Sequence, residues 1–163
     1  MSTTLAPLTG AVAHEQPRLD RAAQQATAQA TLECLIVSTN TRRRELLSRA
    51  AVANGWTTVV CGDADSARQL ASRIVLKLAI VDVERTSPAE SDKLRELSAE
   101  LVRSGGPLLV VCGADGDVQQ EIWARQLGAW LYLPGIAVAD AMALLCNEAR
   151  QVIEKTHLNL YVH

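Results

Sequence analysis

The sequence predicts an α/β protein with one doubly wound parallel sheet built from five consecutive strand–helix units. From residue 32 onward, apolar runs of strand length alternate with segments that have helical periodicity, a texture typical of βα units. The run "VLKLAIVD" at residues 75–82 is almost continuously apolar, as in a central strand whose two faces are both covered by helices. We therefore expect a (βα)₅ domain over residues 32–155.

The first two units follow from apolar stripes and stop signals. The strand "LECLIVS" (32–38) leads into a helix whose apolar stripe is Leu46, Leu47, Ala50 and Ala53, and Asn54-Gly55 ends it. The second strand is "TTVVC" (57–61). An aspartate in "GDADSARQLASR" can cap the helix that follows, whose apolar face is Ala67, Leu70 and Ala71.

The third helix has the clearest start in the chain. Ser87 can cap it, Pro88 suits its first position, and Glu90 completes an S-x-x-E capping box. Its apolar stripe is Leu94, Leu97, Leu101 and Val102, and Gly105-Gly106 ends it.

The last two units complete the alternation. "PLLVVC" (107–112) is the fourth strand, and Asp117 with Gln120 can cap a helix whose expected buried stripe is Val118, Ile122, Trp123 and Leu127. "WLYLP" (130–134) is the fifth strand. The final helix is expected from Val138, Met142, Leu145, Ala149 and Ile153.

The two ends have a different composition. Residues 1–31 are rich in Ala, Gln, Thr and Pro without a sustained apolar stripe, which indicates a flexible arm. At residues 156–163, alternating Leu158, Leu160 and Val162 suggest an extra strand or a docking tail.

Composition narrows the classes of function. The formal net charge of −2 and a pI of about 5.9 give no electrostatic footprint for nucleic acid. The apolar runs are too short to span a membrane, so we expect a cytoplasmic protein. The four cysteines form no C-x-x-C pair, and all three histidines lie in the tails, which argues against zinc or cysteine-hydrolase chemistry.

The strand ends place one carboxylate, Asp82, at the edge where a doubly wound sheet holds its ligands. The element order, "LAIVD" ending the third strand and "GDVQQEIWARQLGAWLYLPG" from the fourth helix into the fifth strand together resemble the receiver domains of response regulators. The resemblance covers residues 32–155 and implies a flavodoxin-like sheet with strand order 2-1-3-4-5. It makes Asp82 the equivalent of the phosphorylated aspartate.

The resemblance also implies helpers that this chain lacks. Receivers hold Mg²⁺ with an acidic pair after the first strand, and place Thr or Ser after the fourth strand and Lys, then cis-Pro, after the fifth. The matching positions here are Ser38 and Thr39, Cys112, Gly135 and Ile136. Aspartyl phosphate formation needs cations to offset the crowded negative charge, so we expect a degenerate pocket without a metal and a structural role for Asp82.

The neighbouring charged residues leave alternatives open. Arg42, Arg43 and Arg44 occupy the first helical turn, where the helix dipole disfavours positive charge. They either pair with Asp82 or a bound anion, or form a solvated basic face. Asp63 and Asp115 can help bind a metal or serve as turn and cap residues.

The leading hypothesis is a non-enzymatic, stand-alone pseudo-receiver that acts by protein–protein interaction and has no cofactor. The resemblance implies a partner surface, here carrying Trp123, Trp130 and Tyr132, for an unknown protein or a second copy in a homodimer. One alternative is a working response regulator phosphorylated on Asp82. Another is an FMN- or anion-binding flavodoxin-like protein, suggested by the hydroxyl-rich "VSTNTRRRE" after the first strand.

Overall fold

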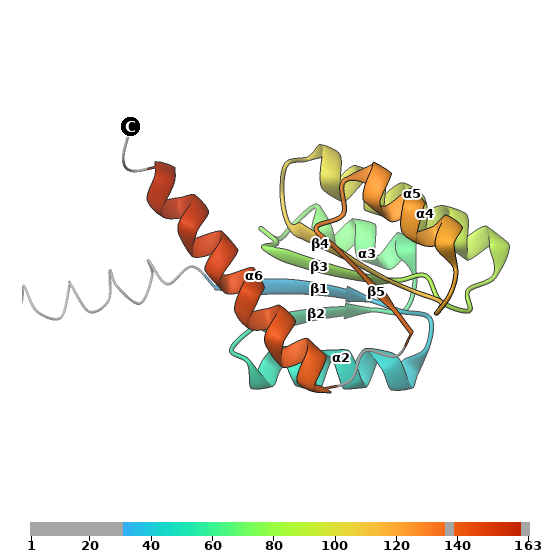
Figure 1. Cartoon of the computed structure of the whole chain (residues 1–163), viewed down its shortest axis with the longest axis horizontal. Helices are drawn as coiled ribbons and strands as arrows, with labels where there is room; N and C mark the ends of the chain where they lie inside the picture. Colours follow the sequence, from blue (N-terminus) through green and yellow to red (C-terminus); the bar gives the residue numbers. More distant parts are fainter. Residues whose placement is uncertain (1–30, 136–138, 161–163) are drawn as a thin grey trace, which may run out of the picture. The chain divides into compact units, whose positions relative to one another are not determined.

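The computed structural model describes residues 31–135 and 139–160 of the chain (Figure 1). The chain divides into two units, residues 1–30 and residues 31–163, and the described residues all belong to the second. The expected arm at residues 1–31 therefore lies outside the described residues apart from Thr31, as do Ile136, Val138 and Val162.

One sheet of five parallel strands forms the centre of the domain, in the order β2-β1-β3-β4-β5. This confirms the expected fold class and strand order. Every residue of β3 is buried, which explains its continuously apolar sequence. The strands are β1 (Glu33–Val37), β2 (Thr57–Cys61), β3 (Leu78–Asp82), β4 (Leu108–Gly113) and β5 (Leu131–Pro134).

Five helices cover the two faces of this sheet (Figure 1). The core is split accordingly into two clusters, one lined by α2 and α6 and the other by α3, α4 and α5. The helices are α2 (Thr41–Ala53), α3 (Ala64–Ala71), α4 (Pro88–Arg103), α5 (Val118–Leu127) and α6 (Ala139–Leu160). Among the described residues, none of these helices is both long and apolar enough to cross a membrane.

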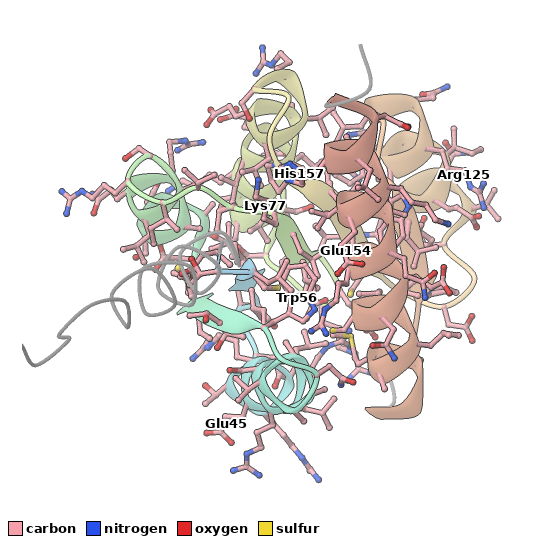
Figure 2. The ribbon with its side chains drawn as sticks, turned by 90° about the vertical axis from the view of Figure 1, so that its left-hand side faces the viewer. Glu45, Trp56, Lys77, Arg125, Glu154 and His157 are labelled. Atoms are coloured by element: carbon pink, nitrogen blue, oxygen red, sulfur yellow. The ribbon has the colours of Figure 1, made fainter. Side chains whose placement is uncertain are left out.

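Packing between α2 and α6 uses two specific contacts as well as apolar burial. Trp56, 2% exposed, lies between the two helices and donates its indole N–H to the carbonyl of Cys146 at 3.3 Å (Figure 2). Arg150 of α6 donates to the carbonyl of Asn54, the C-cap of α2. Because α2 has no basic residue in its own last turn, Arg150 supplies the cation that its C-terminus favours.

Side-chain caps start the helices where the sequence predicts them. Asp63, Ser87 and Asp117 accept from the backbone N–H three residues later, at 2.7, 3.2 and 3.0 Å. The capping box of α4 is only half formed, however. The Glu90 carboxylate accepts from the backbone N–H of Ala64 at 2.9 Å, so it caps α3 from the neighbouring helix rather than closing back on its own.

Two expected apolar stripes are rotated in the structure. Leu46 is 39% exposed and Ala53 is exposed, whereas Leu47 and Ala51 are the buried residues of α2. In α5, two residues of the expected stripe are exposed, and Gln120 and Ala124 are buried instead. Those two are Val118 and Ile122, at 62% and 41% exposed. The rotation of α5 turns the Gln120 amide inward, where it has hydrogen-bond partners.

Within the described residues the chain is helical up to Leu160, so the extra strand expected at residues 156–163 is wrong as far as Leu160. Because α6 continues to Leu160, the expected domain boundary at residue 155 falls inside a helix. The alternation of Leu158 and Leu160 gave a two-residue period. On a helix, positions two residues apart are separated by about 200° around the axis, so such an alternation does not form one face.

Candidate functional site

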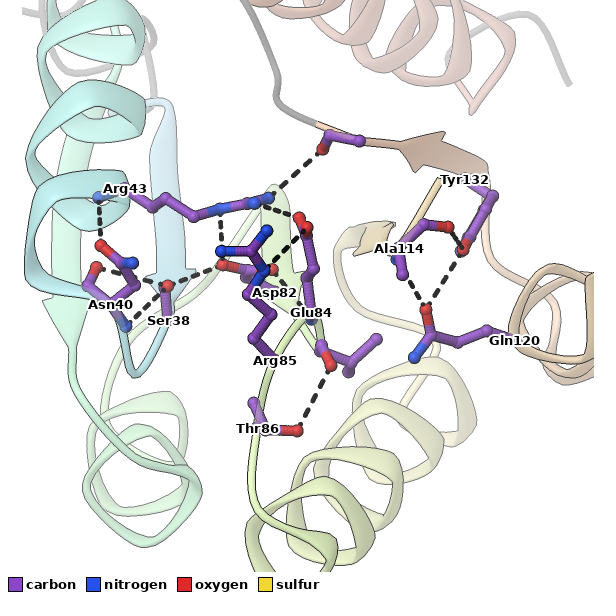
Figure 3. Close-up of polar contacts among 12 residues, drawn as sticks. Ser38, Asn40, Arg43, Asp82, Glu84, Arg85, Thr86, Ala114, Gln120 and Tyr132 are labelled. Carbon is purple, nitrogen blue, oxygen red and sulfur yellow. Dashed lines mark hydrogen bonds and ion pairs between the residues drawn. The ribbon is translucent and has the colours of Figure 1, made fainter. Parts of the chain in front are cut away.

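Asp82 ends β3 at the C-terminal edge of the sheet, and its side chain is only 1% exposed. Its carboxylate accepts three hydrogen bonds or ion pairs (Figure 3). Ser38 Oγ donates to Oδ2 at 2.7 Å, Arg43 Nε lies 2.9 Å from the same oxygen, and the backbone N–H of Glu84 donates to Oδ1 at 3.1 Å. The acid is therefore buried, and both of its oxygens already have partners.

Arg43 reaches this carboxylate from the first turn of α2. Asn40 caps that helix by accepting from the Arg43 N–H at 3.1 Å, which fixes the turn from which the side chain extends. The guanidinium also pairs with Glu84 and donates to the carbonyl of Gly135 at 3.4 Å (Figure 3). One cation thus connects the ends of β3 and β5 with the start of α2, and Arg43 pairs with Asp82 as one of the sequence alternatives proposed.

The other two arginines of the triplet differ from Arg43. Arg44 donates to the backbone carbonyl of Ser38 at 2.7 Å and to the hydroxyl of Thr41 at 3.1 Å. Arg42 is exposed, as the solvated-face alternative expected. The three arginines therefore have different roles: Arg43 pairs with the buried Asp82, Arg44 hydrogen-bonds the loop after β1, and Arg42 faces solvent.

The pKa of Asp82 is raised by burial, which disfavours its charged form. The hydrogen bond from Ser38, the charge of Arg43 and the N–H of Glu84 act in the opposite direction. Burial also raises the pKa of the Cys112 thiol to about 12, and the adjacent Asp82 charge adds to the shift. Cys112 is therefore a neutral, fully buried thiol at neutral pH and cannot act as a nucleophile.

The other residues expected in the pocket have unequal roles. Ser38 is fully buried and contacts Asp82 directly, whereas the neighbouring Thr39 is exposed. Cys112 lies opposite Asp82 in the register of β3 and β4. Gly135 takes part through its backbone carbonyl, which accepts from Arg43 where receivers place a lysine side chain.

These residues do not fit a Mg²⁺ ion of the receiver type. Magnesium requires oxygen ligands in octahedral geometry, several of them anionic in a receiver pocket, but the acidic pair is replaced by Ser38 and Thr39. Within residues 31–135 and 139–160, no three carboxylates, thiols or imidazoles gather closely enough to hold a metal. Both oxygens of Asp63 accept from Ser66, as an N-cap does, so Asp63 does not join Asp82 in a metal site.

The expected aromatic surface is divided between the two sides of the sheet. Trp123 and Tyr132 pack against the core cluster under α3, α4 and α5, while Trp130 packs against the cluster under α2 and α6. The guanidinium of Arg95 lies 4.6 Å from the ring centroid of Trp123, a cation–π contact between α4 and α5.

Tyr132 is held inward by residues that the sequence did not single out. Its hydroxyl donates to the carbonyl of Ala114 at 3.3 Å or to Gln120 Oε1 at 3.2 Å, and Gln120 Oε1 also accepts from the Ala114 N–H (Figure 3). The absence of a side chain at Gly113 makes space for this hydroxyl, since a Cβ there would clash with the Tyr132 oxygen. Gln120 was noted only as a capping-box residue.

Glu84 was also missed by the sequence analysis. Two residues beyond Asp82, it donates its backbone N–H to that carboxylate and shares Arg43 with it. The available signal was the spacing "DVE", an acid two residues after a strand-end aspartate.

Comparison with known proteins identifies the fold. No family model matches the sequence, and no curated protein matches it. The structure resembles a receiver domain protein from Methanospirillum hungatei, with a TM-score of 0.65, 13% identity and coverage of 77% of this chain and 99% of that one. It also resembles the N-terminal domain of an uncharacterized protein from Wolinella succinogenes, with a TM-score of 0.65, 22% identity and coverage of 78% and 99%.

A multidomain neighbour gives the same result. NtrX from Brucella abortus, solved in complex with ADP, aligns with a TM-score of 0.69 and 19% identity over 82% of this chain but only 30% of its own length. Structural neighbours from Methanospirillum hungatei and Clostridium thermocellum are named as response regulator receiver domain proteins. The chain therefore has the CheY-like fold of response-regulator receiver domains.

Proposed function

We propose that this chain is a receiver-like signalling module that works by binding another protein, without Mg²⁺-dependent phosphorylation of Asp82. One observation carries the proposal: Arg43 and Ser38 occupy Oδ2 of a carboxylate that is 1% exposed. An attacking carboxylate must present a free oxygen in line with the phosphorus atom. In this pocket Oδ2 already accepts from two side chains and Oδ1 from the backbone N–H of Glu84.

Charge balance supports the same conclusion. A phosphoryl group on Asp82 would bring its negative charge beside Glu84, whose carboxylate shares the Arg43 guanidinium with Asp82. Receivers offset that charge with a metal ion and an ammonium group. Here Asp82 and Glu84 share the Arg43 guanidinium, and Arg85, which lies 3.8 Å from Glu84, is 91% exposed to solvent. Arg43 instead ties the pocket together, so the module would present a constant surface to its partner.

The proposal is tested by exposing the full-length chain to acetyl phosphate and, separately, to beryllofluoride, each with Mg²⁺. We expect no gain of one phosphoryl group in intact mass spectrometry and no change in tryptophan fluorescence. The DrrB receiver domain, a structural neighbour with a TM-score of 0.63 and 10% identity that was solved in its BeF3-activated form, is the positive control for beryllofluoride. Stoichiometric phosphorylation that disappears in Asp82→Asn would instead establish a working response regulator.

The partner-binding half of the proposal has its own test. Affinity capture with the wild-type chain and with Asp82→Asn is expected to recover the same specific protein in equal amounts. If the partner binds only the wild-type chain after treatment with acetyl phosphate, recognition depends on phosphorylation. The non-enzymatic role and the cytoplasmic location remain predictions.

A further inference from the structure

The C-terminal half of α6 extends past the sheet without packing against it. Figure 1 shows this half running beyond the starting ends of the strands, and Figure 2 labels Glu154 and His157 on it. All residues from 154 to 159 are exposed. A helical segment this short gains little from propensity alone, so packing on one of its faces would stabilise it.

One face of α6 carries a stripe that is complementary to its own reverse, because glutamate and lysine exchange places about a central glutamine. The stripe consists of Leu144, Glu148, Gln151, Lys155 and Leu158. At about 100° per residue these five positions fall within an arc of about 80°, roughly opposite the buried Leu145, Cys146 and Ala149. All five are exposed, the two leucines by 64% and 66%.

We infer that this stripe, the α6 stripe, pairs with the same stripe of a second copy of the chain in an antiparallel arrangement. A two-fold axis through Gln151 would place Leu144 beside Leu158 of the other copy, and Glu148 beside its Lys155. The contact is then self-complementary, as a two-fold dimer interface must be. A parallel pair would instead place glutamate beside glutamate and lysine beside lysine, which is unfavourable.

The spacing and the free charges fit this arrangement. Positions 144, 148, 151, 155 and 158 repeat with the alternating steps of four and three residues that characterise paired helices. Neither Glu148 nor Lys155 forms an ion pair within the part of the chain that the structure describes. The central polar residues cost stability but fix register and orientation. A weak, salt-sensitive dimer follows.

Charge reversal tests the pairing by sedimentation equilibrium of the full-length chain, up to about 1 mM protein. We expect reversible dimerisation of the wild type. Glu148→Lys alone and Lys155→Glu alone should each weaken it by about tenfold, because two attractive pairs become repulsive. The double variant and an equimolar mixture of the single variants should recover wild-type association. A monomeric wild type, or a mixture that fails to associate, would overturn the inference.

Cross-linking tests the orientation independently. Gln151→Cys should form a covalent dimer under mild oxidation, since the two positions meet at the two-fold axis. Leu158→Cys is the matched control: in an antiparallel pair its two copies lie about 21 Å apart along the helices, too far for a disulfide. Equal cross-linking of both variants would refute the antiparallel arrangement.

The native thiols do not interfere, because all four are buried. Circular dichroism of each variant checks that it is folded. The α6 stripe does not include Asp82 or its partners, so failure of these tests would leave the proposed function of the pocket standing.

Discussion

Asp82 shows how burial and pairing oppose each other at a single residue. Removing a carboxylate from water destabilises its charged form and raises its pKa. Three donors stabilise the charged form and offset part of this shift. A buried ion pair contributes little net stability, but removing one partner leaves an uncompensated charge. The contribution of Arg43 to stability is therefore best measured by removing it, which leaves Asp82 as a buried carboxylate without its cation.

Replacing Arg43 by alanine is expected to lower the free energy of unfolding by about 2 kcal/mol at neutral pH, since Asp82 would lose its cation. Urea denaturation followed by tryptophan fluorescence measures this. Arg42→Ala is the matched control, because Arg42 is exposed on the same helical turn, and it should change stability by less than about 0.5 kcal/mol. Equal losses in the two variants would show that the pair with Asp82 contributes nothing.

The raised pKa of Asp82 also predicts the sign of a pH effect. The folded chain binds this proton more tightly than the unfolded chain, so the contribution of Asp82 to stability falls as pH rises from the ordinary value of 3.8 through the raised one. The free energy of unfolding of the wild type minus that of Asp82→Asn should decline across this window and then level off. A difference that grows with pH would mean that pairing outweighs burial.

At the scale of elements, Glu90 shows a helix start that depends on a neighbour. Its carboxylate accepts from the first N–H of α3 while Ser87 caps its own helix, so α3 and α4 are connected at their N-terminal ends. The N-terminal turn of α3 has a partial positive charge, which a carboxylate stabilises.

Glu90→Ala is expected to lower the free energy of unfolding by about 1 kcal/mol, as the loss of a helix cap does. Asp92→Ala, at an exposed position on the same helix, is the control and should be close to neutral. Hydrogen exchange provides the specific readout. Protection in the first turn of α3 should fall in the Glu90 variant, and unchanged protection there would argue against a cap supplied by α4.

The sequence was sufficient for the features that depend on local chemistry. The caps at Asp63, Ser87 and Asp117 and the buried β3 follow from a few adjacent residues. A pair between the arginine triplet and Asp82 could be proposed but not decided, and the contact of Arg43 with Gly135 was not proposed, because both depend on how distant loops meet. The orientation of α5 was missed, since periodicity favoured Val118 and Ile122 whereas packing buried the polar Gln120.

At the scale of the whole molecule, the described domain has three layers, and its last helix, α6, extends beyond them. The sheet is sealed on both faces, and the packing of α6 ends near Ile153, the last of its residues that pack against the core cluster. The remaining turns are held only by the helix itself, as far as the described residues show.

A chain that stops after Ile153 is therefore expected to keep its fold. Its urea midpoint at low protein concentration should match that of the full chain, because residues 154 to 159 are all exposed. Its self-association should be lost, since Lys155 and Leu158 are removed. A large fall in the midpoint would mean that these residues stabilise the monomer.

The division of the core has a practical consequence for the cysteines. Cys34, Cys112 and Cys146 all belong to the cluster under α2 and α6, and Cys61 alone belongs to the other. Burial raises the pKa of each of these thiols, so a modifying reagent can react only after the surrounding layer opens. Each layer of the unaltered chain therefore contains a thiol whose labelling rate reports the opening of that layer. Faster labelling of Cys146 than of Cys61 would show that α6 separates from the sheet before the opposite layer opens.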